Sequence, residues 1–397
     1  MRKGRKVEAG ATAAKASRSF ILKKNELLPL LPQEVIIFNI LVRLRADKLY
    51  KFRSVCRSWY NLINDPFFIQ SHLENSTPGL IIKRYIVDRK PIYQTDFKEM
   101  KDRKNTKQDL KFGNIGEVIG SCNGLVLLKT KRKRLSVANL ITKQILELPS
   151  ATSDNLNFDR QCGFTYVSEI GIYKLVHLLL DDYTLKCEVL SLGCSGCNTW
   201  RCVNGSSLSL LSEDEKWQFH GSETVTINGI VYFVGVRHVQ SSSVHIVSFD
   251  AGAEVFHMIR APIHDFTICD SFIELGGVLS FVQATDRFIF DTFNVWILKD
   301  WLKGTWVKQH AISIRKPSIL GGTLHRIDSS DFVQVLSSFS HGGRKIILFQ
   351  IKSFSGILSH ITYDLDLNQE SKIQFDIRGH PSGFYTHVNS LISPKLL

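Results

Sequence analysis

The stretch from Leu28 to Phe68 reads LPLLPQEVIIFNILVRLRADKLYKFRSVCRSWYNLINDPFF, and it decides how the first part of the chain folds. Pro32 can occupy the first turn of a helix, where its missing N–H costs nothing. Apolar residues then recur at helical spacing, in one stripe of Val35, Ile36, Phe38, Ile40, Leu41 and Leu44 and a second stripe of Leu49, Phe52, Val55, Cys56, Trp59, Leu62 and Ile63. We therefore predict a small trihelical unit, too apolar on too many faces to complete its core alone.

The order of residues in this stretch resembles an F-box, and it is close to the plant form of that motif. The matching positions are Leu31-Pro32, Ile36, Ile40-Leu41, Leu44, Leu49, Phe52 through Arg57, Trp59 and Asp65 through Phe68. One position departs from the pattern, because Arg45 follows Leu44 where many family members have Leu-Pro. This change affects a turn and leaves the apolar face intact. An ordinary helical hairpin packed on its own domain remains the alternative.

Length and composition predict a soluble chain with several domains. The 397 residues suffice for two or three cores, and 44% hydrophobic and 22% charged residues are typical of globular proteins. We expect no membrane span, because no stretch approaches roughly 18 uninterrupted apolar residues. Residues 1–24 contain basic residues and alanines without the apolar core of a signal peptide, which favours a basic disordered tail over a transit peptide.

The net charge of +13 is concentrated in three stretches, 1–24, 83–111 and 129–134, and the remainder is mildly acidic. These stretches lack the interleaved aromatic residues that stack on bases, so we interpret them as solvated surface and keep nucleic-acid binding as the alternative. The run Lys129 to Arg134 is compatible with a nuclear import signal, but a hairpin tip between two strands explains it equally well.

The eight cysteines indicate reduced, packed thiols in a cytosolic or nuclear protein. Cys194 and Cys197 have the spacing of a zinc turn, with Cys187 and Cys202 on either side. Cys187 lies in a strand pattern and no second C-x-x-C pair follows, so a cysteine-containing loop is favoured over zinc. We expect no metal and no cofactor.

Beyond Thr77 the helical period ends and short strand patterns recur for some 300 residues, which predicts an all-β barrel, sandwich or propeller. Asn123-Gly124 and Asn228-Gly229 predict tight hairpins. A weak internal repeat favours the propeller, since both dipeptides lead into a strand, a polar gap and a second strand that ends near Pro149 or Pro262. Trp200, Trp296 and Trp306 recur as aromatics that would anchor blades. The repeat is too degenerate to count the blades.

The same region resembles the F-box-associated domain of plant F-box proteins, which is β-propeller-like and related to kelch repeats. The phrases that carry the resemblance are Ser121 to Leu125, Val137 to Gln144 with Leu148-Pro149, Cys162 to Tyr166 with Tyr173 to Val176, Glu188 to Leu192, Thr199 to Arg201, Asn228 to Tyr232, Val247 to Asp250, Val295 to Asp300 with Thr305 to Lys308, and Asn389 to Ser393. The predicted domains are a tail at 1–24, an F-box at 25–75, a charged linker with first strands at 76–118, and the β-propeller-like domain at 119–393.

This resemblance implies a substrate receptor of an SCF-type ubiquitin ligase, in the cytoplasm, the nucleus or both. The F-box would bind a Skp-family adaptor, and through it a cullin and a RING protein, while the β domain would bind an unknown protein substrate. The implied adaptor-binding residues are Leu31, Pro32, Ile36, Ile40, Leu44, Val55 and Trp59. Phosphate-loop, zinc-protease and nucleophile-elbow motifs are missing from the sequence, so we expect no catalytic site. A scaffold without ligase function, a propeller enzyme and a nucleic-acid binder are the rival interpretations.

Overall fold

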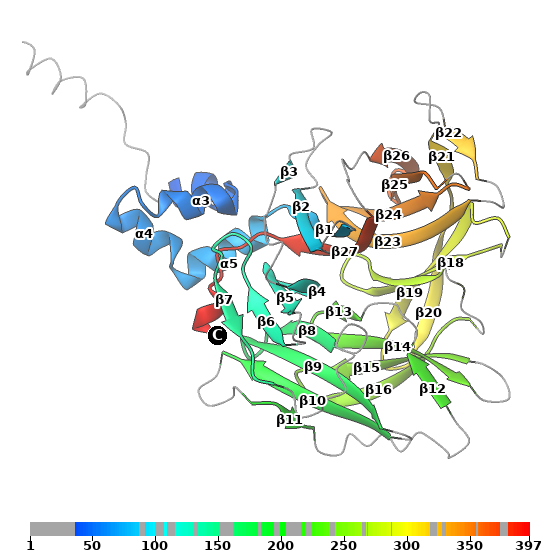
Figure 1. Cartoon of the computed structure of the whole chain (residues 1–397), viewed down its shortest axis with the longest axis horizontal. Coiled ribbons are helices and arrows are strands. Elements are labelled where there is room, and N and C mark those ends of the chain that lie inside the picture. The colour runs from blue at the N-terminus through cyan, green and yellow to red at the C-terminus, as the bar shows by residue number, and fades with distance from the viewer. Residues whose placement is uncertain are drawn as a thin grey trace, which may run out of the picture.

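In the described residues, three α-helices are followed by a closed ring of β-sheets, which confirms the predicted class of an α-helical unit joined to a β-propeller domain (Figure 1). The computed structural model describes most of the chain from Ile36 onward. The described residues are 36–86, 92–99, 107–108, 116–130, 134–150, 162–181, 184–193, 199–203, 216–219, 224–238, 243–263, 267, 269–286, 288–317, 324–327, 331–354, 356–373 and 380–397. The basic segment 1–24, for which we predict a disordered tail, lies outside them.

The helical unit is built from short elements. Their bounds are a π turn at Ile36–Ile40, a 3-10 turn at Leu41–Arg43, α3 at Ala46–Phe52, α4 at Arg57–Ile63 and α5 at Pro66–Asn75. The sequence sets the start of α5, because Pro66 occupies its first turn and the Asp65 carboxylate accepts a hydrogen bond from the Phe68 N–H at 3.0 Å. None of the described helices is long and apolar enough to cross a membrane.

Six blades of antiparallel strands form the ring in the described part of the chain. From the inner strand outward, blade 1 contains β27 (His380–Val388), β1 (Pro78–Ile86), β2 (Ile92–Glu99) and β3 (Lys107–Gln108). In the same order, blade 2 contains β4 (Glu117–Cys122), β5 (Leu125–Lys129), β6 (Leu135–Ala138) and β7 (Ile145–Glu147). Blade 3 contains β8 (Cys162–Val167), β9 (Ile172–Asp181), β10 (Thr184–Leu192) and β11 (Arg201–Cys202).

The remaining blades come from the second half of the chain. Blade 4 contains β12 (Lys216–Phe219) and β13 (Val225–Ile227), which share the inner edge of β14 (Ile230–His238), followed by β15 (Ser243–Asp250) and β16 (Val255–Arg260). Blade 5 contains β17 (Ser271–Glu274), β18 (Leu279–Ala284), β19 (Thr292–Asp300) and β20 (Thr305–Ser313). A hairpin of β21 (Arg315–Pro317) and β22 (Leu324–Arg326) precedes blade 6, which contains β23 (Phe332–His341), β24 (Arg344–Lys352), β25 (Leu358–Asp364) and β26 (Gln369–Ile373).

The ring closes in blade 1, where the C-terminal strand β27 pairs with β1 from the other end of the β domain. Each inner strand contacts the inner strand of the next blade, in the order β27, β4, β8, β13, β17, β23 and back to β27. Closure leaves no free inner edge between the first and last blades, which is the usual way in which a propeller protects its edges. Strands β1 to β3 lie in the stretch 76–118, for which the sequence predicts a charged linker and first strands.

Two tight turns follow the sequence prediction. Asn123-Gly124 joins β4 to β5, and Asn228-Gly229 joins β13 to β14; all four residues have φ between 45° and 82°. This left-handed backbone is the reason for asparagine and glycine at these sites. A Cβ atom on Gly124 would also collide with Ser390, so this turn lies directly against the C-terminal segment. Both predicted hairpins are confirmed.

The turn between the third and fourth strands repeats in four blades. A side-chain Oδ1 accepts hydrogen bonds from the backbone N–H groups two and three residues later, at 2.7 to 3.1 Å, and the residue four positions later has a positive φ. The pairs that share this turn are Asn139 with Lys143, Asp250 with Glu254, Asp300 with Gly304, and Asp364 with Asn368. Four equal turns at equivalent positions show that the blades are a structural repeat.

Tryptophans tie the outer strands of successive blades together. The Trp200 indole N–H donates to the Pro149 carbonyl at 3.0 Å, and the Trp306 indole N–H donates to the Arg260 carbonyl at 3.0 Å. In both cases the tryptophan stands at the start of an outer strand, and the carbonyl lies at the end of the outer strand of the preceding blade. These two predicted blade anchors are confirmed, whereas the Trp296 indole bonds within blade 5, to Gln283 at 3.2 Å.

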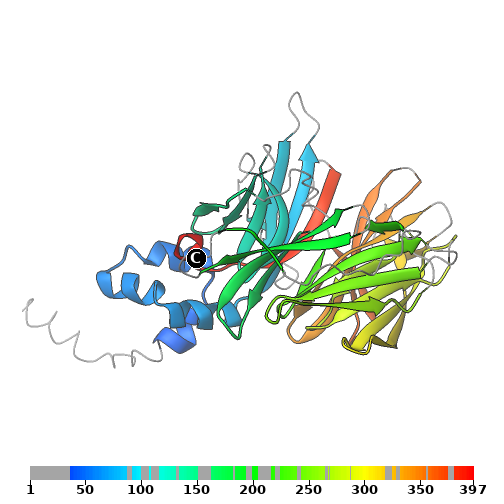
Figure 2. The same cartoon turned by 90° about the horizontal axis from the view of Figure 1, so that it is seen from below.

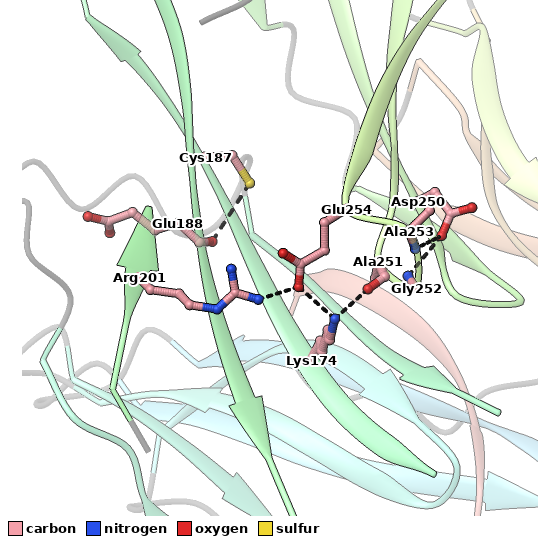
Figure 3. Close-up of polar contacts among 9 residues, drawn as sticks. All are labelled: Lys174, Cys187, Glu188, Arg201, Asp250, Ala251, Gly252, Ala253 and Glu254. Atoms are coloured by element: carbon pink, nitrogen blue, oxygen red, sulfur yellow. Dashed lines mark hydrogen bonds and ion pairs between the residues drawn. The ribbon is translucent and has the colours of Figure 1, made fainter. Parts of the chain in front are cut away.

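An ion-pair cluster joins blades 3 and 4 (Figure 3). The Lys174 ammonium on β9 donates to the Glu254 carboxylate at 2.7 Å and to the Ala251 carbonyl at 2.6 Å, and the Arg201 guanidinium donates to the same carboxylate. The side chain of Lys174 is only 6% exposed, so its charge needs these partners. The two cations lower the pKa of Glu254 against the opposing effect of burial.

Candidate functional site

The interior of the helical unit is completed by the propeller. Leu49, Ile63 and Phe68 are at most 2% exposed and pack in one apolar cluster with Ile141 and Leu391. Ile141 belongs to the turn between β6 and β7, and Leu391 follows β27. Both cartoon views show the helices at one side of the ring, beside the C-terminus (Figures 1 and 2). The propeller therefore supplies part of the apolar surface that completes the core of the helices.

Polar contacts fix the same junction. The Tyr50 hydroxyl donates to the Thr142 carbonyl at 3.4 Å, and the Arg53 guanidinium lies 4.8 Å from the centre of the Tyr50 ring. Within the unit, His72 is 1% exposed and its Nε2 donates to the Leu44 carbonyl at 2.8 Å. Burial lowers the pKa of His72, which keeps the imidazole neutral at pH 7. The helices thus have specific contacts on their propeller side.

On the outside, the helical unit exposes large apolar side chains. Ile40 is 43% exposed, Val55 59%, Tyr60 54% and Phe67 68%. Tyr50 is 37% exposed beside the junction. Exposed apolar side chains gathered on one small unit are typical of a protein interaction site. The propeller covers the inner side of the helices, and Ile40, Val55 and Tyr60 are part of the apolar surface that the described helices expose.

The seven residues that the resemblance implies for adaptor binding fall into three groups. Leu31 and Pro32 lie outside the described residues, and Ile36 is described only in its backbone, within the π turn. Ile40 and Val55 are exposed on the outer surface of the helical unit. Leu44 and Trp59 are half-buried against the core of the helical unit, and the Trp59 ring stands edge-on to Phe52 at 5.5 Å between centroids. Their role in adaptor binding stays a prediction.

Several residues of this site are not indicated by the apolar spacing of the sequence. Tyr60 and Phe67 are exposed and lie outside the two apolar stripes. The signal available in the sequence was that each is an aromatic residue on a helix face that is otherwise polar. Ile141 and Leu391 could not be assigned to the helical core, because they lie more than 60 residues beyond the last helix and belong to β-domain phrases. A residue that is buried only by contact with another domain shows no periodic pattern in the sequence around it.

The structure describes part of the possible zinc site. Cys187 is buried and Cys202 is exposed, while Cys194 and Cys197 lie outside the described residues. Burial raises the pKa of Cys187, which disfavours the thiolate that would bind a metal. Among the described residues, no group of three or more His, Cys, Asp and Glu side chains is arranged to hold a metal ion.

In the described part of the chain, a helical module with exposed apolar side chains is packed against a six-bladed propeller. The family described as F-box associated beta propeller domain matches residues 86–376, and the family described as F-box-like matches residues 28–73. The chain belongs to the plant type of F-box protein that carries a C-terminal F-box associated propeller domain. This confirms the resemblance drawn from the sequence.

Two relatives from Arabidopsis thaliana align with most of this chain. F-box protein At4g19940 is 23% identical over 404 residues, which cover 94% of this chain and 92% of that protein. F-box protein CPR1 is 26% identical over 353 residues, which cover 80% of this chain and 81% of that protein. Among solved structures, the Hadza microbial sialidase Hz136 aligns with a TM-score of 0.40 at 10% identity, over 74% of this chain and 68% of that one.

Proposed function

We propose that this chain is the substrate-recognition subunit of an SCF-type E3 ubiquitin ligase. Its F-box binds a Skp-family adaptor, which connects it to a cullin and a RING protein. The propeller binds a target protein, which is then ubiquitinated and degraded by the proteasome. The match to both family domains supports this role in general.

One observation carries the adaptor-binding part of the proposal. Ile40, Val55 and Tyr60 are exposed on helices whose inner side is already covered by Ile141 and Leu391. Burying apolar surface contributes about 25 cal/mol per Å², so several large side chains can sustain a stable interface. Among the described residues, Ile40, Val55 and Tyr60 are exposed although the junction with the propeller is formed, so adaptor binding at these side chains would not require the two domains to separate.

The propeller acts by tethering, and the chain itself carries out no bond chemistry. Holding a target lysine near the activated ubiquitin raises its effective concentration to roughly the millimolar range for a flexible link. A docked pair of domains can do better, because it also limits the orientation of the target. We place this activity in the cytoplasm, the nucleus or both.

The adaptor interface is tested by co-purification of the full chain with a Skp-family adaptor. An Ile40→Asp/Val55→Asp variant places charges on exposed positions of the F-box and should abolish binding without unfolding the chain. Leu302→Asp is the matched control, because Leu302 is 63% exposed on a propeller turn. Binding by the control but not by the double variant supports the proposal. Failure of the intact chain to bind any Skp-family adaptor overturns it.

Target turnover separates a ligase receptor from a scaffold. Proteins captured by the full chain should lose ubiquitin chains and gain half-life in cells that express only the Ile40→Asp/Val55→Asp variant. If captured proteins keep their half-life although adaptor binding is lost, the chain is an F-box scaffold that delivers nothing for degradation.

A further inference from the structure

A central cavity of about 440 Å³ lies on the axis of the propeller, and all six inner strands line it. This volume is within the roughly 300–1,000 Å³ of small-ligand sites. The Gln334 side chain is exposed in its wall, so the cavity communicates with solvent. Adaptor binding makes no use of it.

The hydroxyl groups on one side of the cavity already donate their hydrogens to protein acceptors. Thr386 donates to the Ser338 carbonyl at 2.7 Å, and Ser338 donates to the Glu274 carbonyl. Ser337 lies 3.1 Å from the Thr386 oxygen, and it must be the donor in this pair because the Thr386 hydrogen is used. These bonds tie blades 5, 6 and 1 together. The lone pairs of the three hydroxyl oxygens remain, so this wall offers acceptors.

Glu274 adds a carboxylate to the same wall. Among the described residues that line the cavity, it is the only one of the Asp, Glu, Lys and Arg type. One carboxylate oxygen accepts the Gly277 N–H at 2.6 Å. Burial raises the pKa of Glu274, and the Gly277 N–H and the Lys345 ammonium offset this only in part. A cation bound beside Glu274 would therefore favour its charged form.

We propose that the central cavity binds a cationic hydrogen-bond donor, a guanidinium or a primary ammonium group, with Glu274 as its counter-ion and Ser337, Ser338 and Thr386 as acceptors. A wall of acceptors with one carboxylate matches a group that has several N–H donors and a positive charge. An anion would meet repulsion there, and a neutral polyol would bring no positive charge to Glu274. The group can belong to a free amine or to an arginine or lysine side chain of a partner protein.

The test is calorimetric titration of the full chain with agmatine and spermidine as cationic probes, and with acetate and N-methylacetamide as anionic and neutral ones. We expect saturable binding of at least one cation with one-to-one stoichiometry and none of acetate. Glu274→Gln should weaken the binding about tenfold or more, as for loss of a charged hydrogen-bond partner. Glu147→Gln, the same change on the exposed outer strand β7, should leave it unchanged.

A second variant guards against misfolding of Glu274→Gln. Ser271 lines the cavity and is half-buried, so Ser271→Lys places a tethered ammonium inside it and should block the probes in a folded chain. The proposal is overturned if neither cation binds at millimolar concentration, if acetate binds instead, or if cation binding survives in folded Glu274→Gln or Ser271→Lys protein. Adaptor co-purification is independent of all these titrations, so failure here leaves the proposed function intact.

A third titration distinguishes the two sources of the cation. The probe is the capped peptide acetyl-Gly-Arg-Gly-amide, which carries the same guanidinium as agmatine on a short backbone. Tighter binding of the peptide than of agmatine assigns the cavity to a partner's side chain. Tighter binding of agmatine assigns it to a free amine.

Discussion

Asn139 in blade 2 is joined to Ser390, 251 residues later, by a hydrogen bond from its Nδ2 to the Ser390 carbonyl at 3.0 Å. The same Nδ2 donates to the Ile392 carbonyl at 2.8 Å. Its Oδ1 meanwhile accepts the Ile141 and Thr142 N–H groups, as the aspartates do in the equivalent turns of blades 4, 5 and 6. Asparagine replaces aspartate here because only the amide can hold the turn and the C-terminal segment at once.

Asn139→Asp should therefore lower the free energy of unfolding by about 2–4 kcal/mol, because it removes two donors and sets a buried anion against two carbonyl oxygens. Urea denaturation of the two proteins measures the difference. Asp250→Asn is the control, since it keeps the accepting oxygen of the equivalent turn and should cost less than about 1 kcal/mol. Equal losses in the two variants would contradict the special role of the Asn139 amide.

Ile141→Ser should loosen the helices from the propeller. Ile141 is 7% exposed in the core of the helical unit, and a hydroxyl there loses apolar contact and gains no partner. We expect a loss of about 2–4 kcal/mol and faster hydrogen exchange in α5 than in the blades. Ile170→Ser, at a turn position that is 52% exposed, should change neither. Unchanged exchange in α5 would show that the junction does not support the helices.

The sequence could predict the parts of this fold that repeat locally. Helical spacing around Leu49 and Trp59 predicts the helical unit, and Asn123-Gly124 and Asn228-Gly229 predict two hairpins that the structure contains. The number of blades could not be predicted, because the residues of the repeated turn vary: its first position is Asn or Asp, and its fifth position is Lys, Glu, Gly or Asn. A left-handed φ and a side-chain acceptor recur in every such turn, and several residue types satisfy them.

The site was predictable to a smaller extent. Ile40 and Val55 lie exposed as an interface requires, but the patterns gave no reason to expect Leu44 and Trp59 half-buried or Tyr60 and Phe67 exposed. Helical periodicity marks apolar residues without telling which side faces its own domain and which faces a partner. Which side of the helices is buried depends on Leu391, and this residue reaches the helices only because the ring closes.

Acid should destabilise the protein below about pH 6.5 through its buried histidines. Burial lowers the pKa of His177 to about 4 and of His387 to about 3. As pH falls below the ordinary pKa of about 6.5, each of these histidines binds a proton in the unfolded chain but not in the folded chain. The free energy of unfolding therefore falls by about 1.4 kcal/mol per pH unit for each histidine. This loss continues until the folded pKa is reached.

His387→Gln isolates one of these contributions. Between about pH 6 and pH 4.5, the unfolding free energy of this variant should fall less steeply than that of the wild type, by about 1.4 kcal/mol per pH unit. The two slopes should agree above about pH 7.5, where neither state binds the proton. Parallel curves over the acid range would show that His387 is not the proton acceptor on unfolding.

Trp306→Phe removes one tie between blades 4 and 5 and keeps most of the aromatic packing. The Arg260 carbonyl loses the indole donor that lies at 3.0 Å, so we expect a loss of about 1 kcal/mol. Thermal unfolding should show the shift, and Trp301→Phe serves as a control because no indole hydrogen bond is part of its contact with His257. A melting temperature equal to that of the control would contradict the tie.

Glu254→Gln tests the cluster between blades 3 and 4. The carboxylate of Glu254 is shared by Lys174 and Arg201, and the Lys174 side chain is 6% exposed (Figure 3). Gln keeps the shape and one acceptor but removes the negative charge, which leaves the Lys174 ammonium buried with the Ala251 carbonyl as its remaining partner in the cluster. Removing one partner of a buried ion pair lowers the free energy of unfolding by about 3–5 kcal/mol. Because Arg201 and Glu254 are partly exposed, we expect a loss at the lower end of this range for Glu254→Gln.

Lys174→Met in the Glu254→Gln background should recover part of that loss, since it removes the stranded charge and keeps an unbranched apolar chain of similar length. Urea denaturation of the two single variants and the double variant gives the coupling between the residues. Additive losses would mean that Lys174 and Glu254 act separately. A double variant more stable than Glu254→Gln alone would establish that the cost comes from the uncompensated ammonium between the two blades.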